Sequence, residues 1–268
     1  MVRGDSGEEV WHYDAPEKLC GVAANWEKTN LFLHGPKGCG QVVALDSSTG
    51  EYRHTRDMLA SNTVALFQSR DSIGMLAPSR TELLRYDLVR TVEVGEKKTS
   101  VKPNKQKYLE CTFTSALTRK ELLATAQTCP DKNTKLVRLL KTKPEDSDVP
   151  EEFHEYEVPA GSELVGISVD RAVIYVPGNG IRAKDEKDNK GSRFQILDKQ
   201  GKFKQIPADP APLLDPHKRQ SELFSAQTAD SAHAMSWFDG KRVVAFKPST
   251  MEPRFQVEGC LLYTSDAA

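Results

Sequence analysis

The chain has 268 residues, of which 38% are hydrophobic and 28% charged, with 17 Gly, 15 Pro and a formal net charge of −1. This composition is typical of a turn-rich globular protein and excludes an intrinsically disordered one. The near-balance of charge argues against nucleic acid as a partner, because phosphate binding requires a basic surface. No apolar stretch approaches the roughly 18 residues that a membrane-spanning helix needs.

A repeated pattern runs along the chain: an alternating apolar strand, a polar turn, and a second strand rich in aromatic or branched residues. It starts at residues 41, 81, 134, 192 and 241, so the intervals are 40, 53, 58 and 49 residues. This pitch suits the four-stranded blade of a β-propeller, about 40 to 50 residues long, with loop insertions. The five instances are Gln41–Thr55, Thr81–Glu96, Thr134–Val158, Ser192–Pro207 and Lys241–Gly259.

Two more strand-like runs precede the pattern in each unit, which gives the four strands that a blade requires. In the third unit, residues 119–128 have helical propensity, but their place in the repeat predicts a strand. The sequence therefore predicts an all-β fold, an incomplete β-propeller of four-stranded antiparallel blades with about five blades present. The clearest preceding runs are residues 20–24 and 31–34, 63–68 and 72–77, and 163–169 and 171–176.

Polar insertions interrupt the repeats, and we expect two of them, residues 97–107 and 208–219, to offer loops to a protein partner. The last nine residues, CLLYTSDAA, resemble a translated sequencing adapter, with a native strand over 261–264 as the alternative. We therefore expect a propeller fragment over residues 1–259 and a non-native tail over residues 260–268. The start of the chain has no signal-peptide pattern, so we expect an export segment to be missing.

The most specific motif is Ala44-Leu45-Asp46-Ser47-Ser48-Thr49-Gly50-Glu51. It resembles the Ala-x-Asp-x-x-Thr-Gly repeat of quinoprotein (PQQ)-like β-propellers, and residues 197–202 are a weaker echo of it. The resemblance implies a tight turn between the outer strands of a blade, with Asp46, Thr49 and Gly50 as its turn residues. Asp46 would bond to backbone groups, and Gly50 would tolerate a positive φ.

In that family, a Trp four residues after the Gly docks one blade on the next, but this chain has His54 there. The segment Trp11-His12-Tyr13 is similar to the outer strand with which such chains close the ring against the last blade, and an ordinary edge strand is the alternative. The overall pattern resembles that of membrane-anchored envelope propellers of actinobacteria. This resemblance implies an anchor in an N-terminal segment that is not in this sequence.

Apart from Cys260, the chain has four cysteines, Cys20, Cys39, Cys111 and Cys129. The separations within the first and second pair are 19 and 18 residues, and each pair occupies the same place in its unit. The pattern predicts the disulfides Cys20–Cys39 and Cys111–Cys129, with four free thiols in a cytosolic protein as the alternative. Disulfides persist outside the reducing cytoplasm, so we expect an extracytoplasmic protein of the cell envelope.

The chain has no Gly-x-Ser-x-Gly and no His-Glu-x-x-His motif for catalysis, and its six histidines share no metal-ligand spacing. It also has no adjacent cysteine pair, which the quinone site of the family uses. We therefore expect no catalytic, metal or cofactor-binding residues. The predicted function is a non-enzymatic binding or scaffold module for an envelope protein or a small ligand. The alternative is a degenerate quinone-dependent dehydrogenase whose cofactor site lies in missing blades.

Overall fold

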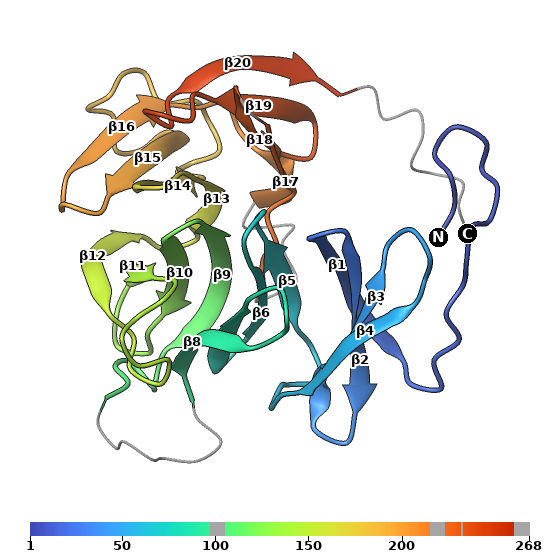
Figure 1. Cartoon of the computed structure of the whole chain (residues 1–268). Coiled ribbons are helices and arrows are strands. Elements are labelled where there is room, and N and C mark those ends of the chain that lie inside the picture. Colours follow the sequence, from blue (N-terminus) through green and yellow to red (C-terminus); the bar gives the residue numbers. More distant parts are fainter. Residues whose placement is uncertain (97–104, 215–222, 232, 260–268) are drawn as a thin grey trace. The chain divides into compact units, whose positions relative to one another are not determined.

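The computed structural model describes residues 1–96, 105–214, 223–231 and 233–259. In these ranges the chain forms twenty β-strands and one short 3-10 helix, η1 (Pro212–Leu214), and it has no α-helix (Figure 1). The expected tail, residues 260–268, lies outside the described residues, as does much of the two insertions expected to hold a partner.

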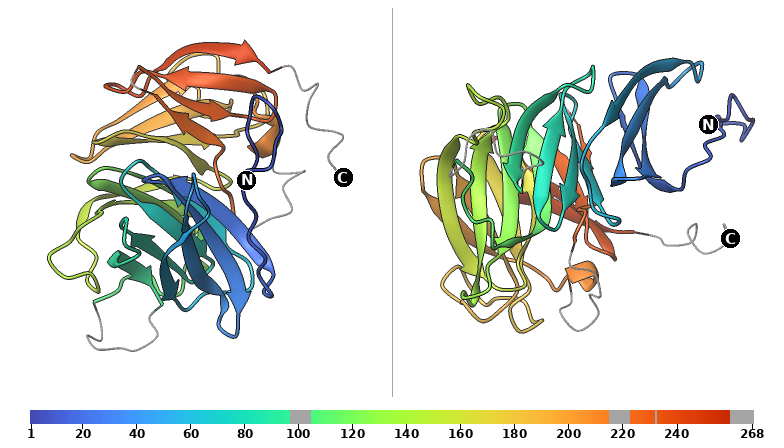
Figure 2. Two further views of the ribbon diagram at one scale, coloured as in Figure 1. Left: turned by 45° about the vertical axis from the view of Figure 1, so that its right-hand side comes forward. Right: turned by 90° about the horizontal axis from the view of Figure 1, so that it is seen from below.

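The strands form five four-stranded antiparallel sheets, and each sheet consists of four strands that follow one another along the chain. Figure 2 shows the strands of each sheet side by side with the usual twist. This connectivity is that of propeller blades, so the predicted fold class is confirmed.

The contacts of the chain divide it into two compact units. Unit 1 consists of Met1–Phe113, Thr118–Glu121 and Lys141–Glu151, and unit 2 consists of Thr114–Leu117, Leu122–Leu140 and the residues from Glu152 onwards.

The first two sheets belong to unit 1. Their strands are β1 (Leu19–Asn25), β2 (Lys28–Gly35), β3 (Gly38–Asp46) and β4 (Tyr52–Asp57), then β5 (Ala65–Gln68), β6 (Ile73–Ala77), β7 (Arg80–Leu84) and β8 (Arg90–Gly95).

Most of the third sheet and all of the fourth and fifth belong to unit 2. The third has β9 (Thr112–Arg119), β10 (Leu122–Thr128), β11 (Thr134–Lys141) and β12 (Glu152–Pro159). The fourth has β13 (Glu163–Ile167), β14 (Arg171–Val176), β15 (Arg193–Asp198) and β16 (Phe203–Pro207). The fifth has β17 (Thr228–Asp230), β18 (Met235–Phe238), β19 (Arg242–Phe246) and β20 (Pro253–Glu258).

The middle strands of each sheet are largely buried, whereas the last strand of each sheet, apart from β8, is exposed or half-buried over most of its length. Every residue of β10 except Thr128 is buried, while five of the six residues of β20 are exposed. Alternate side chains of β10, such as Leu122 and Ala124, join the hydrophobic core of unit 2. This burial on a pleated surface explains why residues 119–128 do not follow their helical propensity.

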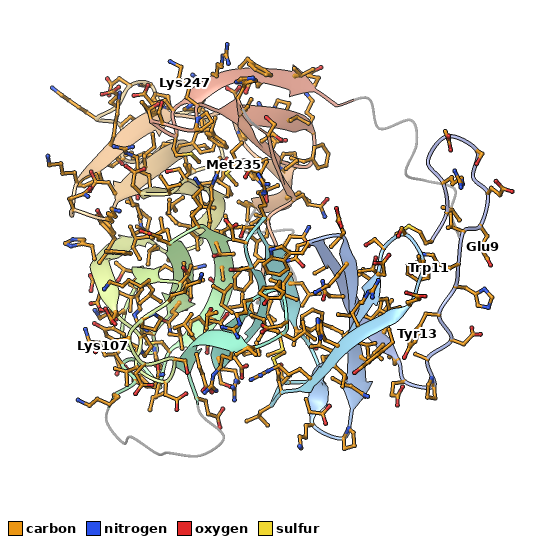
Figure 3. All side chains as sticks on the ribbon, in the orientation of Figure 1. Glu9, Trp11, Tyr13, Lys107, Met235 and Lys247 are labelled. Carbon is orange, nitrogen blue, oxygen red and sulfur yellow. A yellow bond between two sulfur atoms is a disulfide. The ribbon has the colours of Figure 1, made fainter. Side chains whose placement is uncertain are left out.

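The N-terminal segment corrects one prediction: residues 11–13 are not a strand. They lie in an irregular segment that runs beside the first sheet (Figure 3). The indole Nε1–H of Trp11 donates a hydrogen bond to the backbone carbonyl of Ser47 over 3.0 Å. The side chain of Trp11 thus contacts the turn between β3 and β4 while its backbone stays outside the ladder.

Candidate functional site

A cleft of about 290 Å³ opens in unit 2 between residues of the fourth and fifth sheets. The walls come from β15 and β16, from the segment after β16, and from β18, β19 and β20, the orange and red strands of Figure 1. We call it the inter-blade cleft, and its lining includes Phe194, Asp209, Trp237, Arg242, Arg254 and Phe255.

Trp237, on β18, is the largest fully buried side chain of the cleft lining, with 1% of its surface exposed. Its ring contacts those of Tyr175 and Phe194, with centroid distances of 5.6 and 6.2 Å. The indole Nε1–H has no acceptor among the residues that the structure describes. A buried donor without a partner costs about 1–3 kcal/mol, so an acceptor that reached this N–H would stabilise the folded protein.

Tyr175, on β14, fixes the segment that forms one side of the cleft. Its hydroxyl donates to the carbonyl of Asp209 at 3.3 Å and accepts the backbone N–H of Ala211 at 2.8 Å. Burial raises the pKa of Tyr175, so the phenol stays neutral and keeps its proton for this bond. The backbone at Asp209 is therefore held in place without a ligand.

Asp209 accepts hydrogen bonds on both of its carboxylate oxygens. Arg182 donates to Oδ1 at 2.9 Å, and Gln256 donates to Oδ2 at 2.7 Å. Nη1 of Arg242 lies 3.0 Å from the same Oδ2. The bond from Gln256, helped by Arg182, holds the pKa of Asp209 below its ordinary value. Asp209 is thus a charged and occupied acceptor, and a poor proton acceptor.

Asp239 lies in the turn between β18 and β19 and is 1% exposed. Its carboxylate, like that of Asp209, already accepts hydrogen bonds from protein groups. Its Oδ1 accepts the backbone N–H groups of Lys241 and Arg242 at 2.8 and 2.6 Å. Its Oδ2 accepts Nε and Nη2 of Arg242 at 2.9 and 2.6 Å. The carboxylate fixes the Arg242 guanidinium with a two-point contact, which is the strongest geometry for such a pair.

The remaining cationic group of the cleft is Arg254, an exposed residue of β20. None of the ion pairs or hydrogen bonds found among the described residues involves its guanidinium. Beside it, Phe255 is 52% exposed, while Phe194 and Val244 are buried in the wall of the cleft. The arrangement can bind a small molecule that offers hydrogen-bond acceptors and an apolar surface.

The turn residues expected from the quinoprotein-like motif belong to unit 1, and none of them lines this cleft. Asp46 Oδ1 accepts the backbone N–H groups of Ser48 and Thr49 at 2.9 and 3.1 Å. The hydroxyl of Ser48 donates to the same oxygen at 2.6 Å and is the main reason why the pKa of Asp46 is lowered. Gly50 has φ +76°. The motif therefore organises a turn, and its other side-chain contacts are with neighbouring protein groups such as Arg53, which donates to Asp46 Oδ2 at 2.9 Å.

The four cysteines that the structure describes are oxidised. A disulfide joins Cys20 on β1 to Cys39 on β3, with a Cα–Cα distance of 5.9 Å. This bond links the first strand of the sheet to the third across β2. Cys111 and Cys129 are both disulfide-bonded too.

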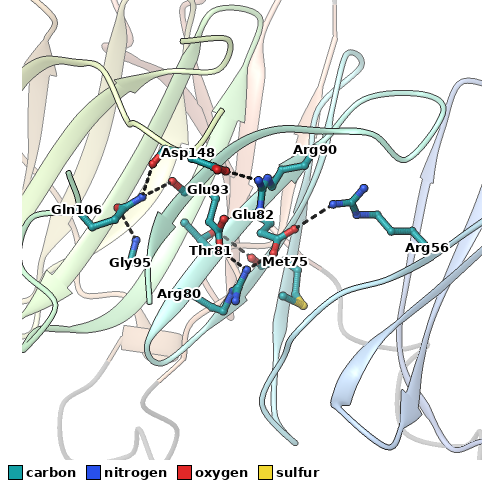
Figure 4. A network of polar contacts seen from close by, with 10 residues as sticks. All are labelled: Arg56, Met75, Arg80, Thr81, Glu82, Arg90, Glu93, Gly95, Gln106 and Asp148. Atoms are coloured by element: carbon teal, nitrogen blue, oxygen red, sulfur yellow. Dashed lines mark hydrogen bonds and ion pairs between the residues drawn. The ribbon is translucent and has the colours of Figure 1, made fainter. Parts of the chain in front are cut away.

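A buried ion network in unit 1 was not predicted from the sequence (Figure 4). Glu82 on β7 and Glu93 on β8 are directly opposite each other, and Nη2 of Arg80 bonds to both, at 2.5 Å to Glu93. Arg90 bridges Glu93 and Asp148, which anchors the loop after β11. Desolvation raises the pKa of Glu93, although the neighbouring guanidiniums oppose this effect. Arg80 and Glu82 are two residues apart in a strand, so they lie on the same face of the sheet, but this spacing alone does not indicate burial.

A second polar cluster lies inside unit 2. Lys135 on β11 bonds through Nζ to Glu163 at 2.5 Å and to Thr114 at 2.9 Å. Glu163 also accepts the hydroxyls of Thr114 and Ser115 at 2.9 and 2.5 Å, and it is fully buried. The cluster connects β9, β11 and β13, and each of its four side chains is buried and hydrogen-bonded.

Across the described ranges, no group of three or more His, Cys, Asp or Glu side chains is placed to hold a metal ion. No helix there is long and apolar enough to span a membrane.

The sheets and their order define the class of protein: this is a β-propeller. BamB from Moraxella catarrhalis is 14% identical, with a TM-score of 0.44, over 94% of this chain and 68% of that one. AztD from Citrobacter koseri is 11% identical, with a TM-score of 0.49, over 95% and 63%. Dihydro-heme d1 dehydrogenase NirN, solved in complex with DHE, is 12% identical, with a TM-score of 0.50, over 97% and 51%.

This chain therefore spans 51–68% of the length of these three proteins. At such identities the likeness concerns the fold alone. No protein-family model matches the sequence, and no curated protein matches it either.

Proposed function

We propose that this chain is an extracytoplasmic, non-enzymatic β-propeller module that binds a small ligand in the inter-blade cleft. One observation carries the proposal: Trp237 Nε1–H is buried in the lining of the cleft without an acceptor among the described residues. A buried group of this kind is stabilised when a ligand supplies its partner. Aromatic packing around Trp237 holds the donor in place beforehand, which lowers the cost of binding.

Binding rather than catalysis suits the state of the two carboxylates in the cleft. Asp209 and Asp239 both accept hydrogen bonds from guanidinium groups. A carboxylate that acts as a general base needs a free oxygen and a pKa near the working pH. The lowered pKa of Asp209 is the opposite of that requirement.

An extracytoplasmic location is supported by the oxidised cysteines. The disulfide between Cys20 and Cys39 and the oxidised state of Cys111 and Cys129 suit a compartment outside the reducing cytoplasm. We therefore propose the cell envelope as the place where the module meets its ligand.

The test is a small-molecule screen on the whole chain, read out by thermal unfolding and by the indole ¹H–¹⁵N signals of its three tryptophans. We expect at least one compound to raise the unfolding temperature with concentration and to move the Trp237 signal, which Trp237→Phe identifies. Pyrroloquinoline quinone belongs in the screen together with alcohols and sugars. Quinone-dependent oxidation would overturn the binding function, and so would a screen in which no compound moves Trp237.

A further inference from the structure

We infer that the ligand of the inter-blade cleft is a small organic monocarboxylate with an apolar body, a step that rests on the binding function proposed above. In the cleft, the carboxylate acceptors are already paired, whereas two side-chain donors are not. The oxygens of Asp209 and Asp239 are occupied by protein donors. The Nε1–H group of Trp237 and the guanidinium of Arg254 have no acceptor among the residues that the structure describes. A complementary ligand must therefore bring acceptors rather than donors.

The charge of the cleft selects an anion with one negative charge. Three guanidiniums, those of Arg182, Arg242 and Arg254, face the two carboxylates of Asp209 and Asp239, so the sum is 3 − 2 = +1. A monoanion neutralises this surplus, whereas a phosphate monoester with two charges would leave one uncompensated. Two parallel N–H groups of a guanidinium match the two oxygens of a carboxylate. Arg254 is the guanidinium of the cleft that has no partner within the described part of the chain, so it can make this contact.

The rest of the lining is apolar and limits the size of the ligand. Phe194 and Val244 are buried, and Ile206 and Phe255 complete the wall. A volume of about 290 Å³ is at the lower end of the range for small-molecule sites. The ligand is therefore closer in size to phenylacetate than to a nucleotide.

The test compares phenylacetate with phenylacetamide, its neutral isostere, and with inorganic phosphate, each titrated into the whole chain by calorimetry. We expect phenylacetate to bind at least about ten-fold more tightly than the amide, since hydrogen bonds to charged groups exceed neutral ones by this much. The indole signal of Trp237 should move downfield on titration with phenylacetate.

Arg254→Gln should remove the ten-fold preference for phenylacetate and leave the fold intact, because the side chain is exposed. Lys247→Gln is the matched control: it removes one positive charge from an exposed residue directly after β19, outside the cleft lining (Figure 3). It should leave the affinity within about two-fold of the unaltered chain, since exposed charges at a distance are screened.

The outcomes separate the two proposals. Equal affinity for phenylacetate and phenylacetamide, or tighter binding of phosphate, would overturn the monocarboxylate and leave the binding function standing. A phenylacetate preference that survives Arg254→Gln would overturn the inference as well. If phenylacetate has no effect while an uncharged compound of the screen moves Trp237, the monocarboxylate also falls. If no compound moves that signal, the binding function falls with it.

Discussion

The indole of Trp11 lies on Gly50, the glycine of the turn between β3 and β4, so closely that an added Cβ at Gly50 would lie 2.8 Å from the ring. The same indole donates to the carbonyl of Ser47 in that turn. In unit 2, His154 stands in the same relation to Gly201, where an added Cβ would lie 2.8 Å from the imidazole. In both turns an aromatic ring from earlier in the chain covers a glycine with positive φ.

We predict that Gly50→Ala destabilises unit 1 by more than the backbone strain alone. Its φ of +76° costs an L-residue roughly 1–2 kcal/mol, and the methyl group must also displace the Trp11 ring. Gly180→Ala is the control, because its φ is +75° but nothing lies within 4 Å of an added Cβ. Urea unfolding followed by Trp fluorescence measures both variants. Equal losses of stability would mean that the Trp11 contact contributes nothing.

The sequence was sufficient for the parts of the fold that depend on local pattern. The alternation of apolar residues predicted the strands, and the Asp46 to Gly50 motif predicted a turn, because both signals lie within a few neighbouring residues. The contact of Trp11 with Gly50 bridges 39 residues and has no local signal. Trp11 was consequently assigned to a strand, which the structure corrects.

The candidate site could not be predicted from the sequence, because it too depends on contacts between distant residues. Trp237 reads as an ordinary core residue of a strand, and only the structure shows that its Nε1–H lacks an acceptor in the described part of the chain. Arg254 reads as a solvated charge. Their presence in one cleft depends on how β18 and β20 pack beside the fourth sheet, which a repeat pattern does not encode.

We predict that removing the first disulfide with Cys20→Ser and Cys39→Ser costs roughly 3 kcal/mol in the loop-entropy model, because the bond closes a loop over a separation of 19 residues. Urea unfolding of the oxidised protein, the reduced protein and the double variant provides the measurement. Reduction of the double variant then reports on the bond of Cys111 and Cys129 alone. A stability unchanged by the substitutions would exclude any role of this bond in holding β1 to β3.

For the other two cysteines we predict one bond, Cys111–Cys129, since both are oxidised in the structure and Cys20 is already joined to Cys39. A non-reduced proteolytic digest should contain this linked peptide pair in the mass spectrum. Linkage of Cys111 to Cys20, or free thiols at both positions, would contradict the pairing.

The buried ion network of unit 1 predicts that one variant loses stability and that a second variant regains most of it. Arg80→Met leaves Glu82 and Glu93 opposed and buried without the guanidinium between them, which should cost about 3–5 kcal/mol. The triple variant Arg80→Met, Glu82→Leu and Glu93→Leu removes all three charges together and should recover most of that loss. Urea unfolding distinguishes the two. A triple variant as unstable as the single one would show that the charges themselves are needed.

The last prediction concerns Tyr156 on β12, whose hydroxyl donates to the carbonyls of Asp198 and, at 3.0 Å, of Lys202. Burial, with the nearby charge of Asp198, raises the pKa of Tyr156 to about 12 from 10.0. Because the folded protein binds this proton more tightly than the unfolded chain, the contribution of Tyr156 to stability is fully present below pH 10. It is lost as the pH rises from 10 to 12.

Tyr156→Phe should therefore lower the stability at pH 8, because the two carbonyls lose their donor, and should make the stability less sensitive to pH between 10 and 12. Tyr52→Phe is the control, since Tyr52 is 61% exposed and should keep the alkaline decline of the unaltered chain. Urea unfolding at pH 8, 10 and 11.5 provides the comparison. A Tyr156→Phe variant that loses stability above pH 10 as steeply as the unaltered chain would assign the alkaline transition to another group.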